Sequence, residues 1–233
     1  MPRPLLLGHR GARAVRTVPE NSLASFDLAL DHGCDGFECD VRMTADRKAV
    51  ICHDPVWHPP ASQLRFRRGM QVASTSRNEL SLLPSLDEVI ARYRATAFLD
   101  VELKVSGIEE IVVHALKASL TRPGLVVSSF LPDALLAVHR VDSTLPLGLI
   151  CENQKQLKRW PDLPVSFVIP NHRMLTPELL DELHSQAKQV MVWTVNDVPS
   201  MRRLAAMGVD GIISDETQLL VQVLGGTNAA TER

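Results

Sequence analysis

Cysteine is scarce in this sequence, and neither charge dominates it. The 233 residues include four cysteines, at positions 34, 39, 52 and 151, with no CxxC pair. A disulfide-stapled scaffold needs a denser set, so that class is excluded and the thiols are predicted to be reduced. The 25 Lys and Arg residues are interspersed with 27 Asp and Glu residues, for a formal net charge of −2. This balance argues against a nucleic-acid partner.

Long apolar runs are also missing. The N-terminal segment has three consecutive leucines at positions 5–7, too few for the core of a signal peptide, and no run is long enough to span a bilayer. These absences predict a cytoplasmic protein without a stable membrane anchor. Apolar residues still make up 45% of the chain and charged residues 22%. That composition predicts a single domain over residues 1–233 with a sizeable core.

Strand-like and helix-like segments alternate along most of the chain. Strands are expected at residues 5–9, 36–41, 98–104, 125–128, 147–150, 166–169, 189–195 and 208–213. Helices are expected at residues 19–33, 85–94, 108–120, 133–140, 153–160, 177–186, 199–207 and from 216 onward. Residues 49–53 follow the second strand too closely for a parallel crossover, so they form an antiparallel extension of it. Eight strands alternating with eight helices predict an α/β fold, the TIM (β/α)8 barrel.

Two segments fall outside this alternation. Residues 54–84 contain several prolines and a basic cluster at 65–68, which predicts a small hairpin or loop insertion on the surface after strand two. Residues 225–233 are rich in small and polar side chains and are expected to form a frayed tail. Neither segment is expected to be a separate domain.

Side chains suited to catalysis follow several of the predicted strands. Glu38 and Asp40 share one strand face because side chains alternate along a strand. If residues 44–47 form a hairpin loop, residues whose numbers sum to 91 stand opposite each other, which places His53 beside Glu38. TIM barrels carry their active sites at the carboxyl ends of the strands. Other such ends here supply His9-Arg10, Glu102 and Lys104, Ser128-Ser129-Phe130, Asn171-His172, Trp193-Thr194-Val195-Asn196 and Ser214-Asp215.

The side chains at these ends suggest phosphate chemistry. Three carboxylates held together repel one another, and a divalent cation relieves that repulsion. Oxygen ligands favour Mg²⁺, Ca²⁺ or Mn²⁺ over zinc. Arg10 and Lys104 suit an anionic oxyacid such as a phosphate. His9 and His53 are suited to remove a proton from an attacking hydroxyl and to give one to a leaving alkoxide, which indicates phosphodiester cleavage.

Each of these features also has a structural explanation. The strand-two carboxylates fit ion pairs with Arg42 or Lys48, and the Glu102-x-Lys104 pattern fits a self-satisfied ion pair. Trp193 fits a core position, and the acid and amide before the first helix fit a cap. The joint placement of acids, histidines and basic residues at one end of the barrel favours the catalytic interpretation.

The motifs together resemble the glycerophosphodiester phosphodiesterase family. Its pattern is HRG, PEN[TS], ExD, HD, ExK, SF, WT[VI]N and a late [TS]D. They occur here in the same order, as His9-Arg10-Gly11, Pro19-Glu20-Asn21-Ser22, Glu38-Cys39-Asp40, His53-Asp54, Glu102-Leu103-Lys104, Ser129-Phe130, Trp193-Thr194-Val195-Asn196 and Ser214-Asp215. The match spans nearly the whole chain and is more similar to the cytoplasmic bacterial branch than to the periplasmic one.

The resemblance implies a TIM-barrel hydrolase with a specific set of site residues. It implies a divalent cation, Mg²⁺ or Ca²⁺ with Mn²⁺ as a further option, and a small-molecule substrate. Expected substrates are glycerophosphodiesters such as glycerophosphocholine and glycerophosphoethanolamine, cleaved to glycerol 3-phosphate and an alcohol in lipid and glycerol metabolism. The implied roles are metal binding by Glu38, Asp40 and Glu102, acid and base catalysis by His9 and His53, substrate binding by Arg10, Lys104, Phe130 and Trp193, and support by Glu20 and Asn21.

One departure from the family pattern leaves alternatives open. After HD the family has an Arg-Thr-Thr-type segment with a glycine, whereas residues 56–60 here are VWHPP. The head-group side of the pocket is therefore expected to differ. An apolar ridge of Trp57 and Phe66 would favour a phospholipase-type diesterase acting on lysophospholipids or inositol phospholipids. The other alternative is a non-catalytic glycerophosphate-binding barrel, and both a monomer and a homodimer remain open.

Overall fold

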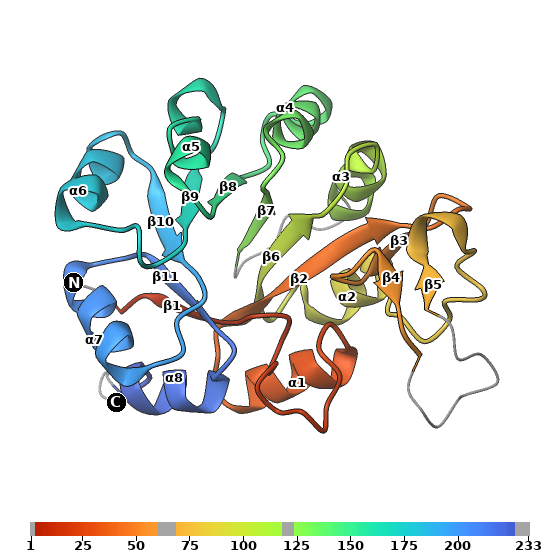
Figure 1. Cartoon of the computed structure of the whole chain (residues 1–233), viewed down its shortest axis with the longest axis horizontal. Coiled ribbons are helices and arrows are strands. Elements are labelled where there is room, and N and C mark those ends of the chain that lie inside the picture. The colour runs from red at the N-terminus through yellow and green to blue at the C-terminus, as the bar shows by residue number, and fades with distance from the viewer. Residues whose placement is uncertain (1–2, 60–68, 118–123, 227–233) are drawn as a thin grey trace.

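The structure is a computed structural model that describes residues 3–59, 69–117 and 124–226 (Figure 1). Eight parallel strands pair in sequence order, and the contact between the first two closes the ring. The TIM-barrel prediction is confirmed. The barrel strands are β1 (Leu5–Gly8), β2 (Gly36–Met43), β6 (Phe98–Leu103), β7 (Leu125–Ser129), β8 (Leu147–Cys151), β9 (Phe167–Pro170), β10 (Gln189–Val192) and β11 (Gly211–Ser214).

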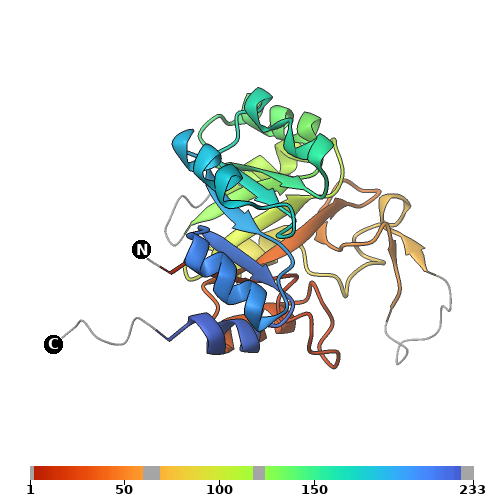
Figure 2. The ribbon, with the colours of Figure 1, turned by 60° about the vertical axis from the view of Figure 1, so that its left-hand side comes forward.

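A helix follows each barrel strand and lies outside the ring (Figures 1 and 2). The predicted helix at 153–160 is wrong in extent: it ends early, and a 3-10 turn at Trp160–Asp162 follows, where Pro161 lacks a backbone donor. The strand predicted at 189–195 is also shorter than expected and ends at Val192. The helices are α1 (Leu23–Asp31), α2 (Leu86–Tyr93), α3 (Glu109–Lys117), α4 (Pro132–Val141), α5 (Gln154–Leu157), α6 (Pro177–Ser185), α7 (Val198–Met207) and α8 (Thr217–Leu224).

Strand alternation divides the core into an inner and an outer part. On β2, Phe37 and Cys39 belong to the large cluster between strands and helices, so the residues between them face the barrel interior. Glu38 and Asp40 therefore share the inner face, as predicted. A smaller cluster of barrel-strand side chains fills the interior below them, comprising Leu7, Phe98, Val126, Ile150, Phe167, Ile169, Met191 and Ile213.

The hairpin after β2 has a different register from the predicted one. Strand β3 (Ala49–Ile51) is antiparallel to β2, with Val41 opposite Ile51, so partner numbers sum to 92 rather than 91. The cause is the loop: Thr44 N donates to Lys48 O at 3.0 Å, which leaves three loop residues, and Arg47 has a φ of 56°. The prediction that His53 stands opposite Glu38 is wrong. His53 instead lies beyond the end of β3.

The predicted insertion packs on the outside of this hairpin. Strand β4 (Val56–Trp57) pairs with β5 (Met70–Gln71), and a 3-10 turn at Val72–Ser74 follows. Both views show this pair beside β3 and remote from α8 (Figures 1 and 2). Trp57 packs against a small cluster that includes Val50 and Leu80. The basic cluster at 65–68, Phe66 and residues 227–233 of the predicted tail lie outside the described residues, so the apolar ridge and the single-domain division remain predictions.

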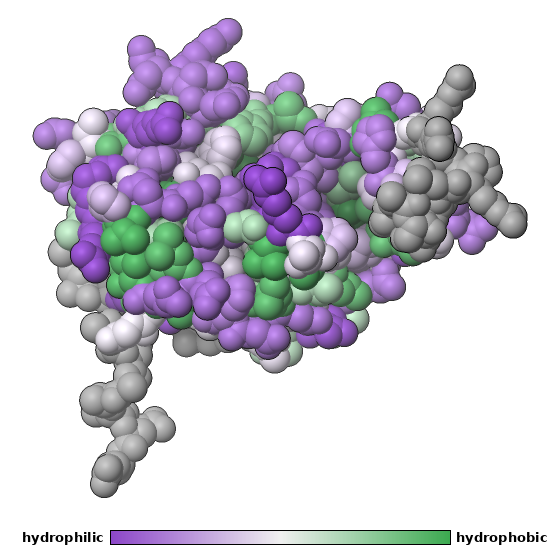
Figure 3. All heavy atoms as spheres, turned by 60° about the horizontal axis from the view of Figure 1, so that its bottom comes forward, coloured by the Kyte–Doolittle hydropathy of each residue, from purple (hydrophilic) through white to green (hydrophobic). Residues whose placement is uncertain are grey.

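The surface is mixed in character. The face in Figure 3 is mostly hydrophilic, with separate hydrophobic areas. The exposed large apolar side chains in the described ranges are Leu82 in the insertion and Leu131 and Val141 at the two ends of α4. Among the described residues, no helix is both long and apolar enough to cross a membrane.

Candidate active site

A cavity of about 270 Å³ lies at the carboxyl ends of the barrel strands. It brings together eight of the eleven predicted site residues. A larger groove of about 1010 Å³, between the β2–β3 hairpin tip and helices α2 and α3, contains none of them. The cavity is lined by His9, Arg10, Glu38, His53, Asp100, Glu102, Lys104, Phe130, Ile150, Glu152, Ile169, Trp193 and Ile213.

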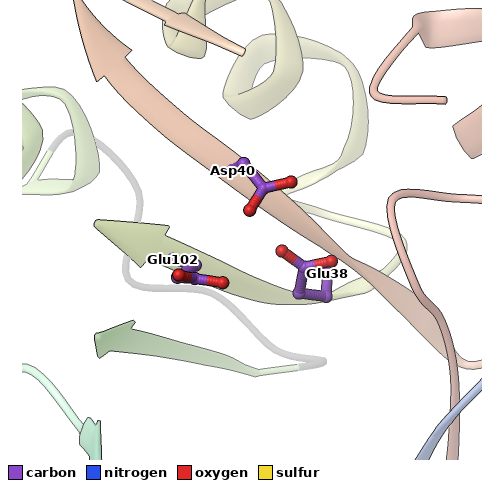
Figure 4. Close-up of side chains that lie close together, drawn as sticks. All are labelled: Glu38, Asp40 and Glu102. Atoms are coloured by element: carbon purple, nitrogen blue, oxygen red, sulfur yellow. The ribbon is translucent and has the colours of Figure 1, made fainter. Parts of the chain in front are cut away.

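Three buried carboxylates converge beside this cavity. Glu38 and Asp40 come from β2 and Glu102 from the neighbouring β6, where it stands opposite Asp40 (Figure 4). One carboxylate oxygen from each lies within 4.8 Å of the others. The three residues are 3%, 1% and 6% exposed, respectively. Adjacent parallel strands with inward-facing acids therefore build the cluster predicted from the ExD and ExK patterns.

The cluster has the donor set that a hard divalent cation requires. Glu38 Oε1 is buried and accepts no hydrogen bond from the described residues, and the only charged partner of Asp40 Oδ1 and Glu102 Oε1 among those residues is the Lys104 ammonium group. Buried polar atoms are otherwise almost always satisfied, so the bare Glu38 oxygen beside two further carboxylate oxygens indicates a place for a ligand. Carboxylate oxygens are preferred by Mg²⁺, Ca²⁺ and Mn²⁺. The residues present fit such an ion.

Burial and mutual repulsion set the protonation of these acids. Burial, with repulsion from Asp40 and Glu102, raises the pKa of Glu38 well above its usual range. Burial, and then Asp40, raise the pKa of Glu102 to about 8. Burial also acts to raise the pKa of Asp40, but the charges of Lys104 and Arg10 outweigh it and hold that pKa below its usual range. The cluster thus favours a bound cation over three free negative charges.

Two basic side chains flank the acids. Lys104 Nζ lies 2.7 Å from Glu102 Oε1 and 3.3 Å from Asp40 Oδ1. Arg10 Nε lies 3.2 Å from Asp40 Oδ2, and Arg10 Nη1 donates to Glu20 Oε1 at 2.8 Å. The predicted ion pair of Glu102 with Lys104 is therefore present, within the larger cluster. Both cations are positioned to meet an anion in the cavity.

The HRG motif adopts a backbone that few residues tolerate. Arg10 has a φ of 53° and Gly11 a φ of 80°. This turn directs Arg10 N toward Glu38 Oε2, a hydrogen bond of 2.9 Å. A side chain at Gly11 would collide with Ser25 of α1, so the close approach of loop and helix requires glycine there. Left-handed non-glycine residues concentrate at functional sites.

The PENS motif braces the same loop. Asn21 has a φ of 55°, and its Nδ2 donates to Asp40 Oδ2 at 2.6 Å. The backbone N of Asp40 donates to Asn21 Oδ1 at 3.3 Å, which makes the contact two-sided. Ser22 caps α1 by accepting a hydrogen bond from Ser25 N. The alternative that Glu20 and Asn21 only cap this helix is therefore wrong, because Ser22 is the cap and Asn21 contacts the acid cluster.

His9 has a partly buried acidic partner. His9 Nδ1 lies 2.7 Å from Asp215 Oδ1, and its Nε2 lies 3.9 Å from Glu38 Oε2. Asn196 Nδ2 and Arg13 Nη1 also donate to Asp215, at 2.7 and 3.2 Å. Burial acts to raise the pKa of Asp215, but these hydrogen bonds, led by His9, hold it far below its usual range. Asn196 and Asp215 belong to motifs without a predicted role, and no sequence signal identified Arg13.

His53 reaches the cavity from the segment after β3. Its Nδ1 lies 2.7 Å from Asp54 Oδ1, and its side chain is 32% exposed. Burial lowers the pKa of His53, and the charges of Arg10 and Lys104 act in the same direction. The two histidines therefore contribute to one cavity from the edge of β2 that faces away from β6, each with a neighbouring carboxylate.

Aromatic side chains form another part of the wall. Phe130 and Trp193 pack edge to face with ring centroids 5.4 Å apart. Trp193 Nε1 donates to Ile169 O at 2.9 Å, which fixes the indole. Lys104 Nζ lies 5.6 Å from the centroid of Phe130. The predicted alternative of a pure core role for Trp193 does not hold, because this residue lines the cavity.

Two further carboxylates line the cavity without being predicted site residues. Asp100 lies in β6, is buried, and accepts a hydrogen bond from Ser128 Oγ at 2.5 Å. Burial raises the pKa of Asp100 to about 7. Glu152 follows β8 and is exposed. Their signals in the sequence are weak, since a single acid at a strand end occurs often.

Comparison with known proteins agrees with these motifs. The model of the glycerophosphoryl diester phosphodiesterase family matches residues 9–219. The chain belongs to this family. It is 26% identical to a glycerophosphodiester phosphodiesterase from Caldanaerobacter subterraneus, with 95% of this chain and 98% of the relative covered. It is 28% identical to a probable glycerophosphodiester phosphodiesterase 1 from Mycobacterium tuberculosis, with 88% and 87% covered. The predicted class, an enzyme of this family, is confirmed.

Solved structures of similar proteins share the fold. A crystal structure of a family protein from Silicibacter pomeroyi has a TM-score of 0.81 at 25% identity, covering 95% of this chain and 94% of that one. A phosphodiesterase from Oleispira antarctica, solved in complex with the product sn-glycerol-3-phosphate, has a TM-score of 0.79 at 24% identity, covering 95% and 96%. The glycerophosphodiester phosphodiesterase family thus accounts for the barrel over nearly the whole length of the chain.

Proposed function

We propose that this chain hydrolyses small glycerophosphodiesters, such as glycerophosphocholine and glycerophosphoethanolamine, to glycerol 3-phosphate and an alcohol. Family membership supports the reaction class. One observation supports the mechanism: His9 and His53 line the same small cavity as Glu38 and Glu102 of the carboxylate cluster. Binding alone requires no pair of proton-transfer groups, so this arrangement favours catalysis over a binding barrel.

The carboxylate cluster is the proposed metal site. Glu38, Asp40 and Glu102 would hold a Mg²⁺, Ca²⁺ or Mn²⁺ ion through one carboxylate oxygen each. When bound, the ion supplies a positive charge that stabilises charge developing on phosphoryl oxygens. Asn21 holds the Asp40 carboxylate in place by a hydrogen bond of 2.6 Å. These contacts orient the acids before any substrate arrives.

The side chains around the cluster bind the substrate and transfer protons. Arg10 and Lys104 pair with non-bridging phosphate oxygens and hold the diester in the cavity. Asp215 holds the Nδ1 side of His9, so Nε2 is directed toward Glu38 and the cavity. His9 and His53 act as a coupled pair: one accepts the proton of the attacking hydroxyl as its oxygen bonds to phosphorus, and the other protonates the leaving alkoxide as the second P–O bond breaks.

Release of glycerol 3-phosphate from both diesters tests this function. His9→Ala and His53→Ala are each expected to lower kcat by about 10²- to 10⁴-fold in folded protein. His184→Ala is the matched control, since His184 Nε2 pairs with Asp210 Oδ2 at 2.9 Å outside the cavity. Near-normal turnover by both active-site variants would contradict the assignment. Tight diester binding without turnover would support the binding barrel instead.

Three further points belong to this proposal. We expect the enzyme in the cytoplasm, which cell fractionation tests. We expect no nucleic-acid partner, in keeping with the net charge of −2, which a gel-shift assay tests. The chain is expected to act as a monomer or homodimer, and light scattering distinguishes the two.

A further inference from the structure

Strands β7 to β11 and the turns after them contribute one charged side chain to the cavity lining among the described residues, and it is that of Glu152. The other contributions from these strands are Phe130, Ile150, Ile169, Trp193 and Ile213, all apolar or aromatic. The other basic and acidic side chains that line the cavity come from β1, β6 and the β2–β3 hairpin with the residues that follow these elements. An isolated carboxylate therefore faces the apolar half of the site.

The backbone of Glu152 is held, while its carboxylate has no partner among the described residues. Glu152 N donates to Gln156 Oε1 at 2.8 Å. Asn153 Oδ1 accepts from Gln156 N at 3.0 Å and caps α5, which fixes the turn after β8. These contacts position the side chain at the cavity without consuming its oxygens.

A carboxylate at this position repels an anionic diester unless the bound molecule donates hydrogen bonds or positive charge to it. Positive charge is the poorer match. The ring of Phe130 already faces the Lys104 ammonium group at 5.6 Å, so a second cation over this wall would meet a like charge. Hydroxyl groups meet no such repulsion, and the aromatic rings offer apolar surface to the CH groups of a short polyol.

The size of the cavity points in the same direction. Its volume of about 270 Å³ lies below the range of roughly 300–1,000 Å³ that is usual for drug-sized ligands. A phosphate with a three-carbon alcohol is compatible with that space. The wall around Glu152 thus matches a small alcohol with free hydroxyl groups.

We infer that the Glu152 carboxylate accepts hydrogen bonds from the two free hydroxyl groups of the substrate's glycerol, while Phe130 and Trp193 pack against its carbon atoms. This inference rests on the proposed function and deepens it. Glu152 would make the enzyme select deacylated glycerol over lysophospholipids, because esterification removes a hydroxyl donor. Hydrogen bonds to a charged group are among the stronger ones, so a substrate that lacks a hydroxyl donor is expected to bind less tightly.

Calorimetric binding of two ligands tests the inference without requiring turnover. The ligands are sn-glycerol 3-phosphate and propyl phosphate, which lacks both hydroxyl groups, each measured in saturating Mg²⁺. Glu152→Ala is expected to weaken glycerol 3-phosphate binding by about 10- to 100-fold and to leave propyl phosphate binding within about twofold. Glu152→Gln keeps the shape and should fall between. Lys155→Ala, on the exposed side of α5, is the matched control and should change neither.

Three outcomes would overturn the inference. In the first, Glu152→Ala binds glycerol 3-phosphate as wild type does. In the second, it loses both ligands equally, which indicates a general effect on the site. In the third, glycerol 3-phosphate binding is unchanged while kcat/KM falls for glycerophosphocholine but not for glycerophosphoglycerol, which assigns Glu152 to a cationic head group. A wild-type protein that binds selectively yet hydrolyses no diester would contradict the proposed function alone.

Discussion

His9 Nδ1 lies 2.7 Å from Asp215 Oδ1, although 206 positions separate the two residues in the chain. Closure of the barrel brings them together, because β1 pairs with β11 and Gly8 stands opposite Ser214. The first and last motifs of the sequence therefore form one unit of the site. The partly buried Asp215 carboxylate fixes which ring nitrogen of His9 faces the cavity.

Asp215→Asn is expected to lower kcat by about 10²- to 10⁴-fold, with a smaller change in KM. The amide no longer carries the charge that complements the His9 ring, and it presents a donor where the carboxylate accepted a hydrogen bond. Steady-state kinetics over a range of pH measure the effect. Asp210→Asn, at the His184 pair outside the cavity, serves as the control. An Asp215→Asn enzyme with the wild-type rate and pH profile would remove Asp215 from the account.

Metal-free protein is expected to lose stability as the pH rises from about 5 to about 8. Burial raises the pKa of Glu102 to about 8 and that of Asp100 to about 7, above ordinary values of 4.5 and 3.8. In this window the folded state retains protons that the unfolded state has released, so the free energy of unfolding falls with increasing pH. Burial lowers the pKa of His53, so this one residue makes the free energy of unfolding rise with pH and offsets part of the effect.

Calorimetric melting in EDTA at several pH values measures this dependence. Glu102→Gln should flatten the slope, because it removes one of the groups with a raised pKa. Saturating divalent cation should also reduce the slope, since the ion takes the place of the protons. A Tm that rises steadily between about pH 5 and about pH 8 in EDTA would contradict the burial argument.

Asn21 allows the hydrogen-bonding and backbone contributions to be separated. Asn21→Ala and Asn21→Gly both remove the 2.6 Å hydrogen bond to Asp40, and both should weaken metal binding. Alanine must also adopt the φ of 55°, whereas glycine adopts it freely. Asn21→Ala should therefore be less stable than Asn21→Gly by about 1 kcal/mol. Urea unfolding of the two variants measures the difference, and equal stability would argue against strain at this position.

The barrel and the acid cluster could be predicted because their signals are periodic and local. Alternating strands and helices specify the topology, and the i, i+2 spacing of Glu38 and Asp40 specifies a shared face. The hairpin register could not be obtained this way, because it depends on Arg47 accepting a left-handed conformation that shortens the loop.

Contacts between distant parts of the chain also could not be predicted from the sequence. Arg13 lies in a loop with no motif of its own, and it reaches Asp215 only because the barrel closes beside it. Glu152 is a lone acid at a strand end, which is common in proteins of this fold class. Its place in the cavity depends on the packing of β8 and α5, which single-residue patterns do not encode.

Metal dependence of glycerol 3-phosphate release from glycerophosphocholine is the most direct test of the central claim, that the Glu38, Asp40 and Glu102 cluster holds a cation required for hydrolysis. The wild-type enzyme is assayed as purified, after EDTA treatment, and after separate addition of Mg²⁺, Ca²⁺ and Mn²⁺. The account predicts that EDTA abolishes release and that at least one ion restores it, but not in Glu38→Gln. Undiminished release after complete removal of divalent ions would contradict it.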